Sequence, residues 1–473
     1  MQEPARIAID LGAESCLISL LRWKNGNPAI ELVHSIPNGP VHRGPSLCWP
    51  IAAILTGLEE GLRKAAALAL EGIASIAVDG WPVDYVRLTP EGQPLHEPFC
   101  DRDERTIHTK VAADAMMRPR DLFARTGALP HRINTVYQLL ADPDDHVDPR
   151  APWVLLPEYV LHWLGGSRVA EFSNATHTGL VDLKTGDWDR ELFRIFDIPL
   201  DAAPPIVRAG AQVGRIKGSL ATLDAYRETQ LIASASHAAA SAIAGIPACL
   251  DSTAYIHIYP GTLSLAGTLA TAPVTTGEAF AARFTNLGAA TGDLCFHAPI
   301  NGMWLLKQCM KAWSAEGRAW NLEDLIEQAA SSSFPGVINV DAEPLLLESD
   351  MPERINHQLW RRRWATIPDV AGNEPVFARV IFESLAARYA TALDDLERML
   401  DRKMERIHML GTGGRNKLLV ELIARRTGLP VDIGEVESVT IGNFAVQLAA
   451  NQAGGEALSS DSIRRWAKIL CER

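Results

Sequence analysis

The chain has 473 residues, more than one hydrophobic core usually holds, so we expect two large domains. Hydrophobic residues make up 47% and charged residues 22%, as in ordinary soluble globular proteins. The net charge of -12 disfavours nucleic acid and anionic membranes as general partners.

The cysteines and the apolar segments bear on the cellular compartment. The seven cysteines form no C-x-x-C pair and are odd in number, which is typical of reduced, mostly buried thiols. The first apolar run starts almost at once, without the basic and apolar regions of a secretory signal. The most apolar region, residues 48–78, carries several charges and is too polar to span a bilayer. We therefore expect a cytoplasmic protein.

The amino-terminal 80 residues predict three strands, a helix and a fourth strand. Short apolar runs at residues 7–9, 16–23 and 30–36 are separated by turn residues. Apolar residues at intervals of three and four predict a helix over 50–70, and residues 73–79 read as a strand. This order, with Asp10 and Gly12 in the first turn, is how an actin-like nucleotide-binding lobe begins.

Two of these strands end in carboxylates. Asp10, followed by Gly12, lies in a turn whose N–H groups could meet phosphate while the Asp holds hydrated magnesium, although Asp-x-Gly is also a common plain turn. Asp79 and Asp84 flank Trp81, a combination that suits a polyol because carboxylates accept hydroxyl protons and an indole packs on sugar C–H groups. The alternative is a turn whose acids cap nearby N–H groups.

The middle of the first half offers weaker candidates. The charged cluster at 100–106 favours a solvated face or a capped helix, with Arg102 and Asp103 available to an oxygen-rich ligand. Residues 142–150 read as a surface connector and 153–163 as a helix. The polar cluster at 173–178 could bind hydroxyls or cap the next element, and the acids of 185–189 read as turn and cap formers.

Residues 233–265 divide the chain into two lobes. They begin with a run of small residues around one histidine and end in a strand-turn-strand, with strands at 255–259 and 263–267. Gly261 and Thr262 in this turn suit a phosphate, although an ordinary hairpin has the same pattern.

The second half contains the clearest helix, over 375–400, where apolar residues repeat at helical spacing and mark a core face. A strand at 407–410 then leads through Gly-Thr-Gly-Gly-Arg-Asn into a helix over 417–427. A glycine-rich turn that opens a helix fits the purine or phosphates of a nucleotide, but the spacing is neither a Walker loop nor a dinucleotide fingerprint. A final packed helix follows, and from residue 454 a polar tail with one short basic helix.

Taken in order, these segments resemble the FGGY carbohydrate kinases, most closely the rhamnulokinases. The resemblance rests on eleven short segments that run through nearly the whole chain: residues 10–15, 76–84, 102–106, 134–138, 173–176, 236–237, 261–262, 302–305, 382–385, 413–416 and 442–443.

The resemblance implies an α/β protein of two actin-like (ribonuclease H-like) ATPase domains around a central cleft. Residues 1–240 would form the sugar-binding domain and 241–473 the ATP-binding domain. Sugar and ATP would be the partners, with Mg²⁺ as cofactor, and the protein a monomer or homodimer. The implied sugar-side residues are Asp79, Trp81, Asp84, Asn174 and His237; the implied nucleotide-side residues are Gly12, Ser15, Gly261, Thr262, Gly413, Gly414 and Asn416, with Asp10 positioning magnesium through water.

The chain departs from the family pattern at four places. Rhamnulokinases carry an Asp after the His of the Ser-His motif, the base that takes the proton from the sugar hydroxyl, and here that position is Ala238. His237 is a weak substitute. The first phosphate turn lacks its usual basic residue and has Leu17 after Cys16; Pro82 replaces a Gly and Leu263 a Trp.

The resemblance and the missing base together leave two possible functions. The first is an ATP-dependent kinase that transfers the γ-phosphate to a hydroxyl of a ketose or related sugar. The second is a catalytically impaired relative that binds sugar, nucleotide or both as a sensor or regulatory partner. General-base catalysis typically contributes about 10²- to 10⁴-fold, while positioning and charge neutralisation usually supply more in phosphoryl transfer. An enzyme without its base is therefore expected to be slow rather than silent, and the kinase is the leading hypothesis.

Overall fold

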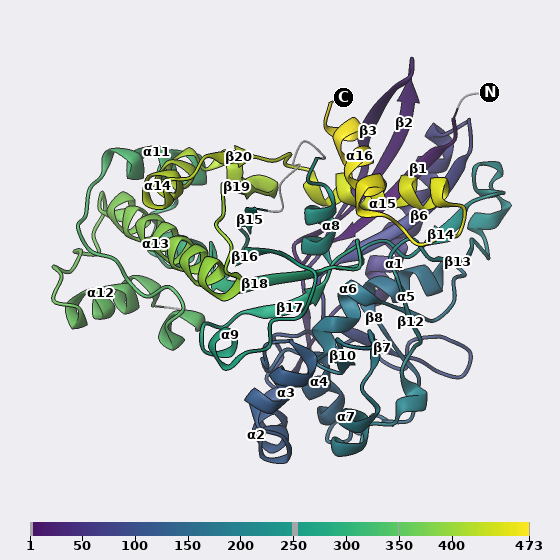
Figure 1. Cartoon of the computed structure of the whole chain (residues 1–473), viewed down its shortest axis with the longest axis horizontal. Coiled ribbons are helices and arrows are strands. Elements are labelled where there is room, and N and C mark those ends of the chain that lie inside the picture. The colour runs from purple at the N-terminus through teal and green to yellow at the C-terminus, as the bar shows by residue number, and fades with distance from the viewer. Residues whose placement is uncertain (1–2, 248–253, 349, 473) are drawn as a thin grey trace.

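The computed structural model describes residues 3–247, 254–348 and 350–472. It has two lobes, each organised around a six-stranded sheet with helices packed against it (Figure 1). Both amino- and carboxy-terminal segments lie on the first lobe, where the purple strands and yellow helices of Figure 1 meet.

The first sheet has the strand order β13-β14-β6-β1-β2-β3. Strands β3, β2 and β1 are antiparallel neighbours, while β6 and β14 continue the sheet parallel to β1. The four strands predicted near the amino terminus are confirmed. The bounds are β1 (Ala5–Leu11), β2 (Ser15–Lys24), β3 (Asn27–Pro37), β6 (Ile73–Gly80), β13 (Gln212–Arg215) and β14 (Gln230–Ile232).

The predicted helix over 50–70 is α1, which connects β3 to β6 and buries Ile54, Leu58 and Leu62. Below it, short strands and helices form a subsidiary core. Their bounds are β4 (Val41–Arg43), β5 (Ser46–Cys48), α1 (Ile51–Leu68), β7 (Tyr85–Arg87), α2 (Thr106–Met116), α3 (Pro119–Thr126), α4 (Thr135–Ala141), β8 (Trp153–Leu155), α5 (Leu156–Trp163), β9 (Ala170–Glu171), α6 (Phe172–Ala175), β10 (Val181–Asp182), β11 (Asp187–Trp188), α7 (Arg190–Ile195) and β12 (Ile206–Val207).

Two expectations for this region need comment. The predicted helix over 153–163 is wrong at its start, because Trp153–Leu155 forms β8 and pairs with β7. A short apolar run satisfies either period, and here tertiary pairing decides. The acids of 185–189 behave as expected: the Asp189 side chain caps α7 by accepting from the N–H groups of Glu191 and Leu192.

The second sheet repeats most of the arrangement of the first. Its order is β17-β18-β16-β15-β19-β20, in which β18, β16 and β15 are antiparallel neighbours and β19 and β20 follow parallel to β15. The sixth strand differs between the sheets, because β17 is added antiparallel to β18 whereas β13 is added antiparallel to β14. The predicted strands at 255–259 and 263–267 are confirmed, as is the strand at 407–410. The bounds are β15 (Tyr255–Tyr259), β16 (Leu263–Ala270), β17 (Thr285–Gly288), β18 (Leu294–Asn301), β19 (Arg406–Met409) and β20 (Val431–Ile433).

The helices of the second lobe include the predicted long one, α13, whose buried face carries Phe377, Ile381, Leu385 and Tyr389. The 3₁₀ helix η6 (Gly411–Arg415) is the glycine-rich turn. The remaining bounds are α8 (Ala238–Ala244), α9 (Gly277–Ala281), α10 (Trp304–Ala315), α11 (Leu322–Ser331), α12 (Met351–Arg361), α13 (Glu374–Leu400), α14 (Lys417–Thr427), α15 (Ser438–Ala453) and α16 (Ser460–Cys471).

The last two helices return to the first lobe. In α15, the Gln447 side chain donates to the carbonyl of Ile7 in β1 at 2.9 Å, and Phe444 joins the apolar cluster with Ala8 and Leu21. The carboxy-terminal segment therefore covers the first sheet, and the domain boundary at 240/241 stays a prediction.

Six of the seven cysteines are described, and the five other than Cys471 are buried free thiols. No helix among the described residues is both long and apolar enough to cross a membrane.

Candidate active site

Two carboxylates lie side by side where β1 and β6 end. Asp10 and Asp79 are register partners in the parallel pair, so both side chains leave the same edge of the sheet. Asp79 is fully buried, and its Oδ1 has no hydrogen-bond partner among the described residues. Burial raises the pKa of Asp10 to about 6, and burial together with the neighbouring Asp10 raises the pKa of Asp79 well above its ordinary value.

Helix α15 holds Asp79 in place. The Asn443 side-chain amide donates to Asp79 Oδ2 at 2.6 Å, and the Gln447 amide donates to Asn443 Oδ1 at 2.7 Å. Ser75 of β6 closes the chain by donating to Gln447 Oε1 at 2.6 Å. At Gly442 a Cβ would lie 1.7 Å from the Ser241 carbonyl, so glycine is what lets α15 approach α8 this closely.

The donor set at this edge fits a hydrated magnesium ion. Mg²⁺ prefers oxygen ligands and usually keeps several waters, bound through one or two carboxylates. Two acids with raised pKa values, one of them with a buried unpartnered oxygen, are groups whose ionised form a divalent cation would stabilise. Asp10 and Asp79 are therefore the residues that would hold it.

The turn after β1 begins with Gly12 and leads into Ser15, the first residue of β2. The Gly12 N–H donates to the Ser15 carbonyl at 3.0 Å, and the Asn38 amide donates to the Gly12 carbonyl at 2.8 Å. A Cβ on Gly12 would lie 2.4 Å from that Ser15 oxygen, so only glycine fits this tight turn.

In the second lobe, two glycine-containing segments, the turn after β15 and η6, lie in contact with each other. Gly261 and Thr262 form the turn between β15 and β16, and their carbonyls accept from the N–H groups of Met303 and Trp304 at 2.9 and 3.2 Å. A Cβ on Gly413 would lie 1.9 Å from Pro260 Cγ, so η6 packs directly on this turn.

The other two predicted nucleotide residues have structural contacts. A Cβ on Gly414 would lie 2.2 Å from Ile433 Cγ2, which shows how closely η6 packs on β20. Asn416 caps α14, since its Oδ1 accepts from the Leu419 N–H at 3.0 Å, while its Nδ2 is buried without a hydrogen-bond partner among the described residues. The free amide group leaves Asn416 able to donate to a ligand.

Contacts between the lobes join the two sets of residues. Tyr259, directly before the second turn, has its pKa raised by burial and by the charges of Asp10 and Asp79, so it lies near both acids. Lys307 of α10 donates to Glu14 Oε1 in the first turn at 2.6 Å and to Thr262 Oγ1 in the second at 3.3 Å. Sequence analysis missed Lys307, which reads as an ordinary polar position of a helix.

His237 and Ala238 lie where α8 begins. Gly80, the last residue of β6, forms a bridge with His237, and Ala238 is the first residue of α8 and half-buried. The His237 ring lies 4.1 Å from that of His177, centroid to centroid. Burial lowers the pKa of His237 to about 3, with a further contribution from His297, which makes this imidazole a poor proton acceptor.

Trp81 and Asp84 form a fixed unit with Trp49. The two indole rings lie 4.2 Å apart, and both indole N–H groups donate to Asp84 Oδ2, at 2.6 Å from Trp49 and 3.0 Å from Trp81. Gln138 donates to the other oxygen of Asp84 at 3.1 Å. Val83, which lies between Trp81 and Asp84 in the chain, has φ +72°, a rare conformation for a β-branched residue. Its carbonyl accepts from the Thr135 hydroxyl at 2.7 Å.

The carboxylate of Asp84 therefore positions aromatic rings, and both its oxygens already have protein partners. Burial and the nearby Asp101 raise its pKa to about 8. Potential ligand atoms of Asp84, Cys100 and Asp101 lie within 4.8 Å of one another, a proximity that sequence spacing did not reveal. Because Asp84 is already saturated with donors, this group reads as part of the scaffold rather than as a metal centre.

Asn174, predicted to line the sugar side of the cleft, lies in the interior of the first lobe. It is fully buried and donates to Glu158 Oε2 at 2.9 Å, while Glu171 accepts from the N–H groups of Ser173 and Ser236 at 3.0 and 3.1 Å. Burial raises the pKa of both Glu158 and Glu171 to about 7. This polar network ties α5 and α6 to the segment that carries His237.

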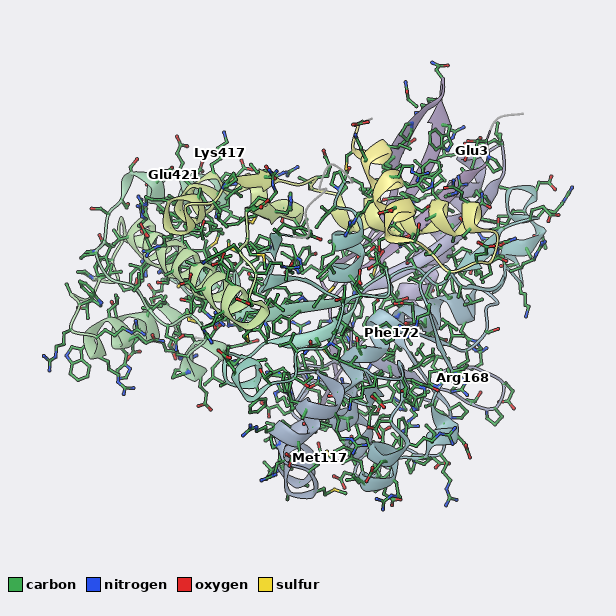
Figure 2. The ribbon with its side chains drawn as sticks, viewed as in Figure 1. Glu3, Met117, Arg168, Phe172, Lys417 and Glu421 are labelled. Atoms are coloured by element: carbon green, nitrogen blue, oxygen red, sulfur yellow. The ribbon has the colours of Figure 1, made fainter. Side chains whose placement is uncertain are left out.

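The start of α6 also lies at the contact between the lobes. Phe172, labelled in Figure 2, is packed so closely against Gly288 of β17 that a Cβ there would lie 2.6 Å from the Phe172 ring. The Arg208 guanidinium lies over the other part of this ring, 3.7 Å from its centroid.

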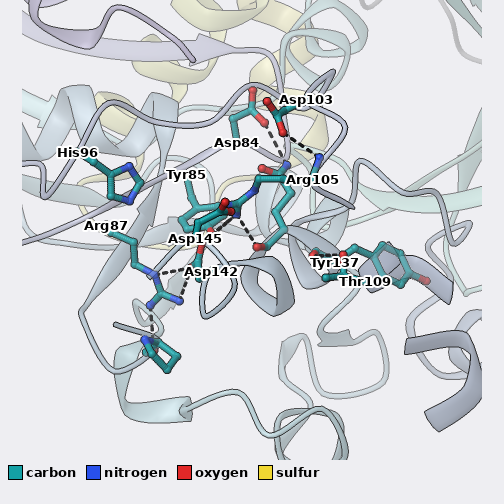
Figure 3. A network of polar contacts seen from close by, with 12 residues as sticks. Asp84, Tyr85, Arg87, His96, Asp103, Arg105, Thr109, Tyr137, Asp142 and Asp145 are labelled. Atoms are coloured by element: carbon teal, nitrogen blue, oxygen red, sulfur yellow. Dashed lines mark hydrogen bonds and ion pairs between the residues drawn. The ribbon is translucent and has the colours of Figure 1, made fainter. Parts of the chain in front are cut away.

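A second polar network supports the Asp84 region from below (Figure 3). Asp142 is fully buried and accepts from Arg87 at 2.8 Å, from Arg105 at 2.8 Å and from the Tyr85 hydroxyl at 2.6 Å. The expectation of a surface connector at 142–150 is thus wrong for Asp142, and the 100–106 cluster contributes Arg105 to the interior. Two charged partners stabilise the buried carboxylate, which explains why a turn-like sequence is internal here.

Comparisons with known proteins agree with this arrangement. Residues 7–245 match the N-terminal domain and residues 257–451 the C-terminal domain of the FGGY family of carbohydrate kinases. A rhamnulokinase of Bacteroides thetaiotaomicron is 30% identical over 465 residues, covering 96% of this chain and 94% of that protein. A rhamnulokinase of Bacillus subtilis is 29% identical, covering 94% and 90%.

Solved structures show the fold. A ligand-bound xylulose kinase from Lactobacillus acidophilus superposes with a TM-score of 0.75 at 16% identity, covering 99% of this chain and 97% of the other. Plasmodium falciparum glycerol kinase with ADP gives 0.73 at 15% identity, covering 98% and 92%. The expected two-domain, actin-like α/β fold is confirmed. Together, the two family matches and the near full-length relatives show that this chain belongs to the FGGY family of carbohydrate kinases.

Proposed function

We propose that this sugar kinase transfers the γ-phosphate of ATP to a hydroxyl of a ketose of the rhamnulose kind. The observation that carries the proposal is the register pair of Asp10 and Asp79 in the first lobe, beside a turn that Lys307 links to the glycine turn of the second lobe. Relatives that cover nearly the whole chain are named for rhamnulose, which is why this ketose is chosen.

On the sugar side, Trp81 is the proposed platform. Its ring is half-buried and is fixed by Trp49 and by the indole hydrogen bond to Asp84, so an exposed part of the indole face is preorganised for sugar C–H groups. Asp84 itself acts through Trp81. Asp79 and His237 lie close together, at the end of β6 and the start of α8, and Asn174 is held in the interior by its hydrogen bond to Glu158.

On the nucleotide side, the N–H groups around Gly12, Ser15, Gly261 and Thr262 are the proposed phosphate contacts, with Gly413, Gly414 and Asn416 around the adenosine. Asp10 and Asp79 would hold Mg²⁺, which when bound neutralises phosphate charge. Orienting the phosphates between two turns on opposite lobes is what the chain contributes to transfer, since positioning supplies much of the catalysis of this reaction.

The missing base defines how fast such an enzyme works. Ala238 offers no proton acceptor, and the low pKa of His237 disfavours it in that role. Glu171 is bonded to the Ser236 N–H nearby but is fully buried with other donors. We therefore propose a kinase that is slower than its relatives by about the general-base contribution of 10²- to 10⁴-fold. The alternative, a regulatory binding protein, is favoured by Ala238 alone.

The test is sugar-dependent ADP release with ATP and Mg²⁺ over a panel of ketoses and polyols, for the native protein and Ala238→Asp in parallel. We expect slow native turnover, highest with rhamnulose, and a rate increase in Ala238→Asp of at least 10²-fold. A silent native protein beside an active Ala238→Asp variant would replace the kinase proposal with the regulatory one. If neither the native protein nor Ala238→Asp releases ADP while both remain folded, the proposed substrate and the proposed site are both rejected.

A further inference from the structure

Lys307 joins the two phosphate turns with one ammonium group. Its Nζ lies 2.6 Å from Glu14 Oε1, in the turn after β1, and 3.3 Å from Thr262 Oγ1, in the turn after β15. These turns belong to different lobes, and Glu14 and Lys307 are 293 positions apart in the chain. A single side chain thus spans the gap between the two segments proposed to hold the nucleotide phosphates.

Backbone hydrogen bonds fix the position of the first turn of α10, which carries Lys307, relative to the turn after β15. The N–H groups of Gly302 and Trp304 both donate to the Thr262 carbonyl, at 3.1 and 3.2 Å, and the Met303 N–H donates to Gly261. A Cβ on Gly302 would lie 2.5 Å from the Gly261 carbonyl, so the entry to α10 is packed against the turn. The first turn of α10 therefore carries Lys307 at a set distance from Gly261 and Thr262.

The charge of Lys307 is the one these turns otherwise lack. Residues 10–17 contain two acids and no base, and residues 259–264 contain no charged group. The position after Cys16, where a basic residue is expected by resemblance, is Leu17, which faces Asp10 across the antiparallel pair. A polyphosphate placed between these turns would meet the negative charges of Asp10, Glu14 and Asp79, and Lys307 is the cation in contact with both turns.

The bond between Lys307 and Glu14 is easily exchanged. The two side chains are 47% and 81% exposed, and exposed ion pairs contribute little because water solvates both charges. A phosphate carries more charge than a carboxylate and offers several acceptor oxygens. In the presence of a nucleotide, Lys307 has a stronger partner within the same reach.

We propose that Lys307 is the phosphate-binding cation of this kinase, supplied by α10 of the second lobe in place of the first turn, and that Glu14 holds it in position until the β- and γ-phosphates of ATP displace the carboxylate. The proposal rests on the proposed function for its ligand. It adds a residue and an exchange of partners that join the two lobes around the triphosphate.

The test measures nucleotide binding by calorimetry, without sugar, using AMP, ADP and the non-hydrolysable ATP analogue AMP-PNP. In Lys307→Met we expect AMP affinity to be unchanged, ADP affinity to fall several-fold and AMP-PNP affinity to fall at least tenfold. Lys307→Arg keeps the charge and should stay within threefold of native. Glu14→Gln frees the lysine and should raise AMP-PNP affinity two- to fivefold.

A matched control comes from the same helix. Lys311 lies one turn further along α10 and pairs with Glu348 at 3.5 Å, so Lys311→Met removes an equal charge without touching either turn. Its AMP-PNP affinity should equal that of the native protein. Thermal unfolding of every variant checks that the fold is kept, as expected for exposed positions.

The outcomes separate this inference from the proposed function. If native protein binds AMP-PNP more tightly than AMP and Lys307→Met does so equally, the lysine inference is overturned while the kinase proposal stands. An equal loss in Lys307→Met and Lys311→Met would also overturn it, because the effect would then be one of net charge. If native protein binds no nucleotide at all, both proposals fail.

Discussion

The two sheets share a core of three antiparallel and two parallel strands, and they carry different residues at corresponding strand ends. In the first sheet the parallel neighbours β1 and β6 carry Asp10 and Asp79 at their next-to-last positions. In the second sheet the corresponding neighbours β15 and β19 end in Tyr259 and Met409, and each is followed by a glycine turn. The first pair of strands therefore carries carboxylates near its ends, and the second pair leads into glycine turns.

We infer from this difference that the two lobes would take different parts in the proposed reaction. Carboxylates suit a cation and hydroxyl groups, whereas glycine turns suit phosphate oxygens because no side chain obstructs their N–H groups. Because both lobes share the same sheet core, the ligand that each would bind depends on the residues at its strand ends and not on its backbone fold. Variants at these ends should therefore separate the effects on metal and sugar from those on nucleotide.

The largest effect is expected from Asp79→Asn, which breaks the acidic end of the first sheet. The variant keeps an oxygen that accepts from Asn443 but loses the charge proposed to face the cation, so kcat should fall by about 10³-fold, as for the loss of a major electrostatic contact. The measurement is steady-state ADP release with the sugar that gives native turnover. The exposed Asp144→Asn serves as the control, and a kcat within threefold of native in Asp79→Asn would contradict the assignment.

The next prediction concerns pH and the buried support of the first lobe. The raised pKa of Glu158, about 7, means that the folded state favours the protonated acid, so its contribution to stability is present below the ordinary pKa and is lost as pH rises toward 7. Glu158→Gln keeps an acceptor for Asn174 without the charge. Its free energy of unfolding relative to native should increase by roughly 3 kcal/mol between pH 4 and pH 8. Urea unfolding at both pH values checks this, and a difference that does not change with pH would count against a buried, strained Glu158.

On the second sheet, Gly413→Ala tests the glycine end alone. The added Cβ would lie 1.9 Å from Pro260 Cγ and must push η6 away from the phosphate turn. We expect nucleotide affinity to fall about tenfold, corresponding to about 1.4 kcal/mol, with sugar affinity unchanged. Gly39→Ala, where a Cβ meets nothing within 4 Å, is the control. An equal loss of sugar affinity in Gly413→Ala would contradict the assignment of η6 to the nucleotide side alone.

The smallest effect is expected from Trp81→Phe. The ring remains but the indole N–H to Asp84 is lost, and a net hydrogen bond is worth about 1 kcal/mol. We expect the KM for sugar to rise about fivefold while kcat and the KM for ATP stay near native values. An increase in the KM for ATP instead would place Trp81 outside the sugar side.

Local patterns were sufficient to predict most of the frame. The helix over 375–400 and the first four strands follow from apolar periodicity, because their burial is a property of the local sequence. Trp153–Leu155 shows the limit: a three-residue apolar run takes its structure from the strand it pairs with, which lies some 70 residues earlier in the chain.

The site was predicted as a set of positions but not as a set of contacts. Asp10 and Asp79 follow from carboxylates at strand ends. Three of the contacts join residues that are distant in the chain. They are the hydrogen bond from Trp49 to Asp84, the bonds from two arginines to the buried Asp142, and the bond from Lys307 to Glu14. No spacing rule reports such pairs, because they depend on how the two lobes and the subsidiary core pack.

The most direct test of the central claim, that the acidic edge and the glycine edge act together to phosphorylate a sugar, is detection of the product. Native protein, ATP, Mg²⁺ and rhamnulose are incubated and followed by ³¹P NMR, at a protein concentration high enough to detect a rate about 10⁴-fold below that of a typical sugar kinase. The account predicts a sugar monophosphate that accumulates in step with ADP. ADP without sugar phosphate, or no change in ATP while Ala238→Asp forms the product, would contradict it.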